Sequence, residues 1–182
     1  MEVIDLKLKG LKLIKPKVFQ DERGFFLETY QEEAYQQLGI PCSFVQDNHS
    51  FSQYGCIRGM HFQSLPGQAK LVRVAEGEIF DVAVDIRPDS PTFGQWESVV
   101  LDGKSHHQLF IPVGFAHGFC VMSPKVHVLY RVSHPYIPAS EKGFRWDDPN
   151  VKIDWPIKNP ILSERDQKAP FFEEILEIVE MR

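Results

Sequence analysis

The sequence predicts an all-β fold, either an antiparallel sandwich or a barrel, because it contains many short strand-like segments and few helix signals. Thirteen prolines and twelve glycines punctuate the 182 residues, and the apolar runs between them are mostly brief. Short strands joined by regular turns are typical of these architectures. A chain of this length can bury one substantial core, and no repeat or linker interrupts it. We therefore expect residues 1–182 to form a single domain.

Two helices are expected beside the strands. The run Thr29-Tyr30-Gln31-Glu32 resembles a capping box, and Gly39 could end a short helix that follows it. Near the C-terminus, Pro170 is a plausible first helical residue, and the segment FFEEILEIV after it has an apolar stripe. We expect this C-terminal helix to pack on the outside of the strands.

Residues 70–87 contain the clearest strand pattern. LVRVA leads to a turn signal at Glu76-Gly77, and EIFDVAVDIR then alternates between two faces. One face carries Phe80, Val82, Val84 and Ile86, and the other carries Ile79, Asp81, Ala83 and Asp85. Further strands are expected at residues 96–101, 108–111 and 126–132.

The composition indicates an ordinary soluble globular protein. Hydrophobic residues make up 43% of the chain, and the formal net charge of -5 argues against general nucleic-acid binding, which needs a basic face. No apolar run approaches the roughly 18 residues that span a membrane, and the first residues, MEVIDLKLKG, lack the apolar core of a signal peptide. Three cysteines without a CxxC motif fit a reducing compartment. We expect a cytoplasmic protein with no membrane or nucleic-acid partner.

Two segments carry the most informative residues. GCIRGMHF reads as a strand that presents Arg58 and His61, and IPVGFAHGF presents His117 after a Pro-x-Gly-x-x-His turn. This pair of segments resembles the two motifs of a cupin barrel, which implies a double-sheet jelly roll. Most cupins hold a metal with an HxH pair, a Glu and a final His, but here the first motif reads His61-Phe62-Gln63. We therefore predict no metal site, which leaves His61 free for acid–base chemistry.

Arg58 and His61 have opposite parity on one strand. Both can face a pocket only if the strand bends or contains a bulge. Gly59, which lies between them, is well placed to allow that irregularity.

Ordered blocks of sequence extend along nearly the whole chain: KVFQDERGFFLETY, FVQDNHS, IRGMHFQ, QAKLVRV, GEIFDVAVDIR, SPTFGQW, IPVGFAHGF, WDDP and LSERD. In this order they resemble the dTDP-4-dehydrorhamnose 3,5-epimerases. The resemblance implies an isomerase that converts dTDP-4-keto-6-deoxy-D-glucose to dTDP-4-keto-L-rhamnose without a cofactor. It also implies a homodimer of jelly-roll barrels.

Epimerisation beside a ketone removes a proton from a carbon and returns one to the opposite face. Carbons 3 and 5 both flank the keto group at carbon 4, so one enolate-stabilising site can serve both. That site needs a base, a cation or donor for the oxyanion, and an acid on the other face. His61 is the best base because imidazole titrates near pH ~6.5. The resemblance gives Asp166 as its orienting carboxylate, although Asp166 could equally cap the turn before the C-terminal helix.

Lys70 and Tyr130 complete the predicted catalytic set. A compact ammonium beside a buried enolate oxygen would stabilise it strongly, whereas Lys70 in isolation would read as an ordinary strand-edge lysine. Tyr130 shares a strand face with Val126, Val128 and Val132, so it should point into the barrel. Its phenol suits the acid that protonates the opposite face. Core packing is the competing role, and the match to the family's tyrosine favours the acid.

The resemblance also implies a binding set for a nucleotide sugar, whose diphosphate suits planar guanidinium groups. The set is Arg23, Glu28, Gln46, Asp47, Asn48, Arg58, His117, Glu141 and Arg165. Tyr136 matches the aromatic residue that stacks on thymine, although a dimer-interface role would also be ordinary. Two departures stand out: Arg165 replaces a Lys found in some members, and His134-Pro135-Tyr136 replaces an Asn/Glu-Tyr-Tyr type of segment.

Three alternatives remain open. The nearest is a mono-epimerase of the same family, which inverts only carbon 3 or carbon 5 of a related nucleotide keto-sugar. A cupin that only binds a sugar nucleotide would have no reason to retain the base, its orienter, the cation and the acid together. A metal-dependent cupin isomerase or oxygenase would need a replacement for the absent HxH ligand.

Overall fold

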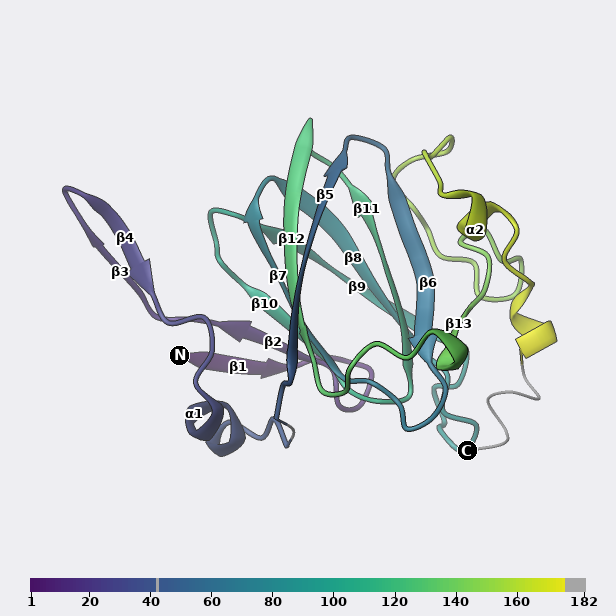
Figure 1. Ribbon diagram of the computed structural model, residues 1–182, viewed down its shortest axis with the longest axis horizontal. Coiled ribbons are helices and arrows are strands. Elements are labelled where there is room, and N and C mark those ends of the chain that lie inside the picture. The colour runs from purple at the N-terminus through teal and green to yellow at the C-terminus, as the bar shows by residue number, and fades with distance from the viewer. Residues whose placement is uncertain (42, 176–182) are drawn as a thin grey trace.

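A computed structural model describes residues 1–41 and 43–175 of the chain. Two antiparallel sheets face each other in it, so the predicted all-β, double-sheet fold is confirmed (Figure 1). The six-stranded sheet has the order β1-β2-β10-β7-β12-β5, and the five-stranded sheet has the order β13-β6-β11-β8-β9. The strands of the first sheet are β1 (Glu2–Asp5), β2 (Lys12–Lys15), β10 (Gln108–Ile111), β7 (Lys70–Glu76), β12 (Lys125–Val132) and β5 (Gln46–Gln53). Those of the second are β13 (Glu141–Gly143), β6 (Ile57–Gln63), β11 (Phe115–Val121), β8 (Glu78–Asp85) and β9 (Trp96–Asp102).

The five strands expected from residues 70–132 all form, with ends that differ by at most a few residues. The turn predicted at Glu76-Gly77 joins β7 to β8. Gly77 has a φ of 92°, and a Cβ at this position would lie 2.2 Å from the carbonyl oxygen of Lys125. Only glycine combines this backbone conformation with so close an approach of another strand.

The main core lies between the two sheets. It includes Val128 from β12, Leu101 from β9 and Phe119 from β11, and its members are at most 5% exposed. Each fully buried side chain of this size contributes about 1.5–3 kcal/mol to folding. β8 is buried on both faces: Ala83 packs between the sheets, and Val82 packs under the C-terminal segment on the outside.

Each outer face carries a cover. The C-terminal segment packs Phe144, Trp155 and Phe172 against the outside of the five-stranded sheet. A short helix, α1 (Glu32–Gln37), packs Tyr35 against the outside of the six-stranded sheet beside Phe110. The inner faces of the two sheets, including those of β5 and β6, are not covered in this way and line a cleft between the sheets.

The helix predictions need correction in detail. The N-cap of α1 is Gln31, whose side chain accepts from the amide of Ala34 at 2.6 Å, and not Thr29. The carbonyl of Thr29 instead accepts a hydrogen bond from the hydroxyl of Tyr35, and Thr29 lies before the start of the helix. Gly39 follows the helix with a φ of 78°, as expected of a helix-ending glycine.

The C-terminal helix predicted from Pro170 onward differs from the structure at its start, and only its first part lies within the described residues. After Pro170 the chain forms a 3₁₀ turn at Phe172–Ile175, and the rest of the predicted helix, residues 176–182, lies outside the described residues. A second 3₁₀ turn lies at Pro138–Ser140, and a helix that the sequence did not predict, α2, spans Glu164–Gln167. None of the helices in residues 1–41 and 43–175 has the length and apolarity needed to cross a bilayer.

A hairpin extends away from the barrel. It pairs β3 (Val18–Asp21) with β4 (Gly24–Leu27) and contacts neither large sheet through strand pairing (Figure 1). Phe19, Phe25 and Phe26 are 51%, 56% and 70% exposed on it. Three exposed phenylalanines on one projecting element form an exposed apolar surface.

Candidate active site

A cleft of about 750 Å³ opens between the two sheets. Inward-facing residues of β5, β6, β7, β11 and β12 form its walls, together with residues from the segment 136–166. It brings together most of the predicted site residues, namely Gln46, Asn48, Arg58, His61, Lys70, His117, Tyr130, Tyr136, Glu141, Arg165 and Asp166.

β6 contains the irregularity that the sequence predicted. His61 pairs with His117 and Arg58 pairs with Phe119, so three residue steps on β6 match two on β11. The extra residue turns Arg58 and His61 towards the same cleft. Gly59 has a φ of 136°, and a Cβ there would lie 2.6 Å from the Cα of Gly118. The expected bulge at this glycine is confirmed.

His61 and Asp166 form a hydrogen-bonded pair. The Nε2–H of His61 donates to Oδ1 of Asp166 across 2.6 Å, and the side chains are 25% and 5% exposed. Burial raises the pKa of the Asp166 carboxyl, but the hydrogen bond from His61 leads the interactions that outweigh burial and hold this pKa below its ordinary value. The cap of α2 is Ser163, whose hydroxyl accepts from the amide of Asp166. The carboxylate of Asp166 is therefore directed at His61 and is not the cap.

Lys70 is the first residue of β7, which lies between β10 and β12 and so is not an edge strand. Its side chain lines the cleft. Burial lowers the pKa of the Lys70 ammonium to about 8, although the carboxylates of Glu141 and Asp81 act in the opposite direction. At neutral pH its ammonium therefore remains mostly charged.

Tyr130 lies on the inner face of β12, as its parity predicted. It packs against the main core, lines the cleft and pairs in register with Asn48 on β5. Burial is the main cause that raises the pKa of its phenol, with Glu141 adding to it, so the hydroxyl stays protonated at neutral pH.

A second histidine–carboxylate pair lies deeper in the cleft. His117 Nε2 is 2.9 and 3.1 Å from the two carboxylate oxygens of Asp81, and Asp81 is fully buried on β8. Burial lowers the pKa of the His117 imidazole, although Asp81 opposes this, so His117 is neutral at physiological pH. Asp81 was not among the site residues predicted from the sequence. The available signal was the presence of two acidic residues, Asp81 and Asp85, on the strand face that also carries Ile79 and Ala83.

The rim of the cleft carries a bidentate ion pair. Arg165 donates from its two terminal nitrogens to Glu141 across 2.8 and 3.1 Å. Burial raises the pKa of Glu141, but Arg165 and Tyr136 outweigh it, and the pKa lies below its ordinary value. Tyr136 is 50% exposed, and its amide donates to the side chain of Gln46. A planar cation and an open aromatic ring thus stand at one edge of the cleft.

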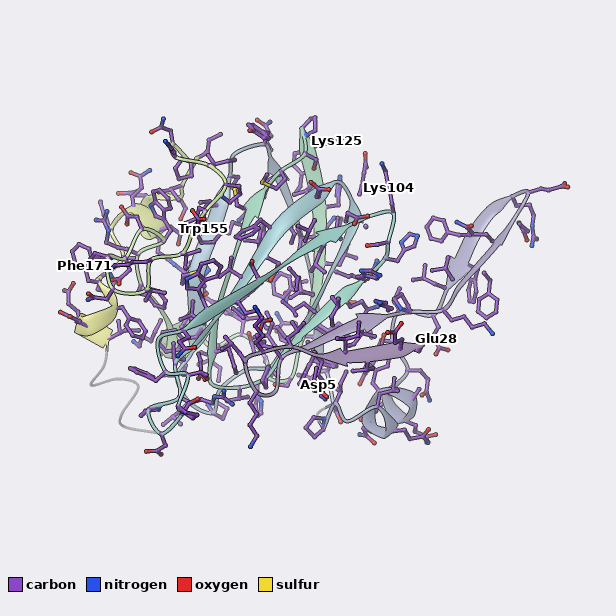
Figure 2. The ribbon with its side chains drawn as sticks, turned by 180° about the vertical axis from the view of Figure 1, so that it is seen from behind. Asp5, Glu28, Lys104, Lys125, Trp155 and Phe171 are labelled. Carbon is purple, nitrogen blue, oxygen red and sulfur yellow. The ribbon has the colours of Figure 1, made fainter. Side chains whose placement is uncertain are left out.

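Three predicted binding residues do not line the cleft. Asp47 has the opposite parity to Gln46 and Asn48 on β5, and its carboxylate lies 3.5 Å from Arg131 on the outer face. Arg23 is in the turn of the β3–β4 hairpin, where it pairs with Asp21. Glu28 follows β4, and Figure 2 shows it at the root of the hairpin, on the side of the molecule opposite Phe171. The hairpin's direction, which no local pattern encodes, separates Arg23 and Glu28 from this cleft.

Other lining residues were not predicted. They include Ser50, Gln63, Gln68, Cys56, Phe119 and Ser163. The even-numbered parity of β5 could have identified Ser50, since it follows Gln46 and Asn48 on the same face. Among the described residues, no group of three or more His, Cys, Asp or Glu side chains is arranged to hold a metal ion.

The model of the dTDP-4-dehydrorhamnose 3,5-epimerase family matches residues 5–174. The chain belongs to this family. It is 47% identical to a dTDP-4-dehydrorhamnose 3,5-epimerase of Shigella flexneri, over 91% of this chain and 93% of the other. It is 41% identical to a dTDP-4-dehydrorhamnose 3-epimerase of Streptomyces niveus, over 93% of this chain and 83% of the other.

A solved structure agrees with this family assignment. The 3,5-epimerase of Legionella pneumophila, crystallised in complex with dTDP-4-keto-L-rhamnose, superposes with a TM-score of 0.94. The two chains are 47% identical, and the match covers 97% of this chain and 96% of the other. The epimerase family therefore shares both the sequence and the double-sheet architecture of this protein.

Proposed function

We propose that this protein is an isomerase that epimerises dTDP-4-keto-6-deoxy-D-glucose at carbons 3 and 5 to give dTDP-4-keto-L-rhamnose. The observation that carries the proposal is the cleft in which the His61–Asp166 pair, Lys70 and Tyr130 meet. Family membership and the Legionella complex support the same class of substrate.

His61 acts as the base. Its Nε2 is engaged with the ionised Asp166, so Nδ1 is the ring nitrogen left to accept a proton. Asp166 orients the ring and stabilises the imidazolium that forms, as carboxylates do in other His–acid pairs. Proton abstraction from carbon 3 or carbon 5 leaves an enolate whose charge gathers on the oxygen at carbon 4.

Lys70 stabilises this enolate, and Tyr130 returns the proton. The ammonium of Lys70 acts in a cleft where low dielectric strengthens its field. His61 belongs to β6 of one sheet and Tyr130 to β12 of the other, so the two groups approach a bound sugar from opposite walls. A protonated phenol opposite the base is the arrangement that inversion of a carbon requires.

The remaining predicted residues bind the nucleotide. Arg58 and Arg165 present guanidinium groups suited to the diphosphate, and the exposed ring of Tyr136 offers a stacking surface for thymine. Gln46, Asn48, His117 and Glu141 contribute polar contacts from the cleft walls. Arg165 in place of Lys keeps the charge and adds a bidentate geometry, here engaged with Glu141.

The active form is a homodimer. The β3–β4 hairpin extends from the barrel with its exposed phenylalanines, and Arg23 and Glu28 lie on it or at its root, away from the cleft of their own chain. A second copy that supplies its hairpin to this cleft would account for both features. Asp47, on the outer face of β5 beside Arg131, belongs in this arrangement to the contact between copies.

Further parts of the proposal concern the chain as a whole. Residues 1–182 form one domain, and the reaction uses no cofactor and no metal. The partners are the dTDP-linked sugar and a second copy, with no nucleic acid or membrane. Cys56 and Cys120 are free thiols, which supports a cytoplasmic location.

A mono-epimerase is the second candidate. The 3-epimerase of Streptomyces niveus is 41% identical to this chain, and the 3,5-epimerase of Shigella flexneri is 47% identical to it. Enzymes of both kinds therefore have a similar identity to this chain. In such an enzyme the same base and enolate would serve, and only one of the two carbons would be reprotonated on the opposite face.

Proton NMR in heavy water separates these readings. We expect dTDP-4-keto-6-deoxyglucose to take up deuterium at carbons 3 and 5, with product detected through a coupled reductase. Exchange at only one carbon would identify a mono-epimerase. If neither carbon takes up deuterium, the result would contradict epimerisation of this substrate.

A further inference from the structure

Ser50 presents a buried hydroxyl without a hydrogen-bond partner. Within residues 1–41 and 43–175, its Oγ is the one buried side-chain nitrogen or oxygen that no protein group satisfies. A buried hydroxyl that lacks a hydrogen-bond partner destabilises the protein, because it has given up its hydrogen bonds to water. Ser50 is a residue of the cleft wall, so its hydroxyl lies next to the space that a bound molecule would occupy.

Its neighbours on the inner row of β5 all have partners. Gln46 donates to Asn48 at 2.8 Å, and Ser52 accepts from Nε of Arg58 at 2.9 Å. Side chains at alternate positions of a strand share one face, so Ser50 lies between these two hydrogen-bonded pairs. In this row of side chains, the missing hydrogen-bond partner therefore belongs to Ser50, which lines the cleft.

Arg58 places a positive charge on the part of β5 that carries Ser50. It reaches from β6 to β5, donating to Ser52 and, through a terminal nitrogen, to the carbonyl of Phe51 at 3.2 Å. Both contacts hold the guanidinium against the strand that carries Ser50. A hydroxyl next to a guanidinium is suited to donate to an anionic oxygen, since hydrogen bonds to charged acceptors are the stronger kind.

We propose that Ser50 is a substrate-binding residue, whose hydroxyl donates to a diphosphate oxygen of the nucleotide sugar beside Arg58. This proposal rests on the proposed function, because it needs a dTDP-linked ligand in the cleft. The ligand satisfies the hydroxyl that the protein leaves unpaired. Ser50 contributes to affinity for the nucleotide and takes no part in proton transfer.

The test is the Ser50→Ala variant, with Ser98→Ala as a matched control. Ser98 is also a strand serine, on β9, but it does not line the cleft. Calorimetry with dTDP should give a dissociation constant about tenfold higher for Ser50→Ala, which is the loss expected for a hydrogen bond to a charged group. The value of kcat should change less than about twofold, since the hydroxyl serves binding alone. Ser98→Ala should bind dTDP like the wild type.

Thermal unfolding without ligand gives an independent readout. Removing an unsatisfied hydroxyl should leave the Tm of Ser50→Ala unchanged or raise it. A clearly lower Tm would mean that Ser50 has a protein partner, which would overturn the proposal.

Two binding outcomes would also overturn it. Equal dTDP affinity in the variant and the wild type, with the same KM for the keto-sugar, would mean that water or nothing satisfies the hydroxyl in the complex. A higher KM for the keto-sugar with unchanged dTDP affinity would move the contact to the sugar. Failure of the wild type itself to bind dTDP would instead contradict the proposed function, so the two failures are distinguishable.

Discussion

Burial and the nearest charges set the protonation states of the residues in the cleft. Tyr130 keeps its proton because burial raises its pKa, and Asp166 stays ionised because His61 outweighs burial. Lys70 keeps its charge at neutral pH with its pKa lowered to about 8. At the scale of single residues, the cleft therefore holds a neutral acid, an oriented base and a cation at the same pH.

Removal of the base should abolish most of the turnover while sparing nucleotide binding. We expect His61→Ala to lower kcat by about 10²–10⁴-fold, the usual contribution of a general base. Its dissociation constant for dTDP, measured by calorimetry, should stay within about twofold of the wild type. His107→Ala is the control, because His107 does not line the cleft. Near-normal turnover in His61→Ala would remove this histidine from the mechanism.

The titration of Lys70 should limit the reaction at alkaline pH. Its ammonium loses the proton as the pH rises through about 8, so kcat/KM should fall above that pH and hold its value just below it. Steady-state kinetics from about pH 6.5 to 10 would measure this, with circular dichroism to verify folding. Replacement by arginine, which stays charged, should remove the alkaline limb from whatever activity remains. A flat wild-type profile to pH 10 would contradict the role of Lys70.

At the scale of elements, two strands bring the polar groups into the cleft by different means. β5 does so through simple alternation, which presents Gln46, Asn48 and Ser50 on one face. β6 needs its bulge, because Arg58 and His61 would otherwise lie on opposite faces. Gly59 makes the bulge compatible with close contact to Gly118 on β11.

Gly59→Ala should therefore destabilise the protein and disturb the cleft. The new methyl would meet backbone atoms of Gly118 and His117 at 2.6 and 3.0 Å, at a φ that alanine adopts only with strain. We expect a loss of about 2–5 kcal/mol in the free energy of unfolding, measured by urea denaturation.

Gly24→Ala separates strain from packing in this experiment. Gly24 has a similar φ of 124°, but nothing lies within 4 Å of a Cβ placed there. It should lose only the part due to backbone strain, about 1–2 kcal/mol. Equal losses in the two variants would mean that close packing at Gly59 is unimportant.

At the scale of the whole molecule, the cleft of one chain lacks three residues of the predicted binding set, Arg23, Glu28 and Asp47. Arg23 and Glu28 belong to the hairpin region, which projects from the barrel (Figure 1, Figure 2). A homodimer with exchanged hairpins predicts that each site combines His61 of one copy with Arg23 of the other. This arrangement can be tested by mixing variants.

Mixed dimers should be more active at low substrate than the average of the two parent variants. Arg23→Ala alone should raise KM about tenfold through loss of a charge-assisted hydrogen bond, and His61→Ala alone should be nearly inactive. After the two are unfolded and refolded together, one site in each mixed dimer has both native residues. Turnover at low substrate should then exceed the average of the parents. Simple averaging, or a monomer in sedimentation velocity, would contradict exchange of hairpins.

The sequence by itself determined the strands β6 to β10 and β12, the bulge at Gly59, the inward direction of Tyr130 and the family, because alternation, glycine and ordered motifs are local properties. The tertiary structure decided the N-cap of α1, the partner of His117 and the direction of the hairpin. It also brought Asp166 to His61 across 105 positions of sequence, where the sequence left a capping role equally open. The unpartnered hydroxyl of Ser50 became visible only once every neighbour was in position. These features depend on which distant strands pair and what they bury, and local patterns carry no record of either.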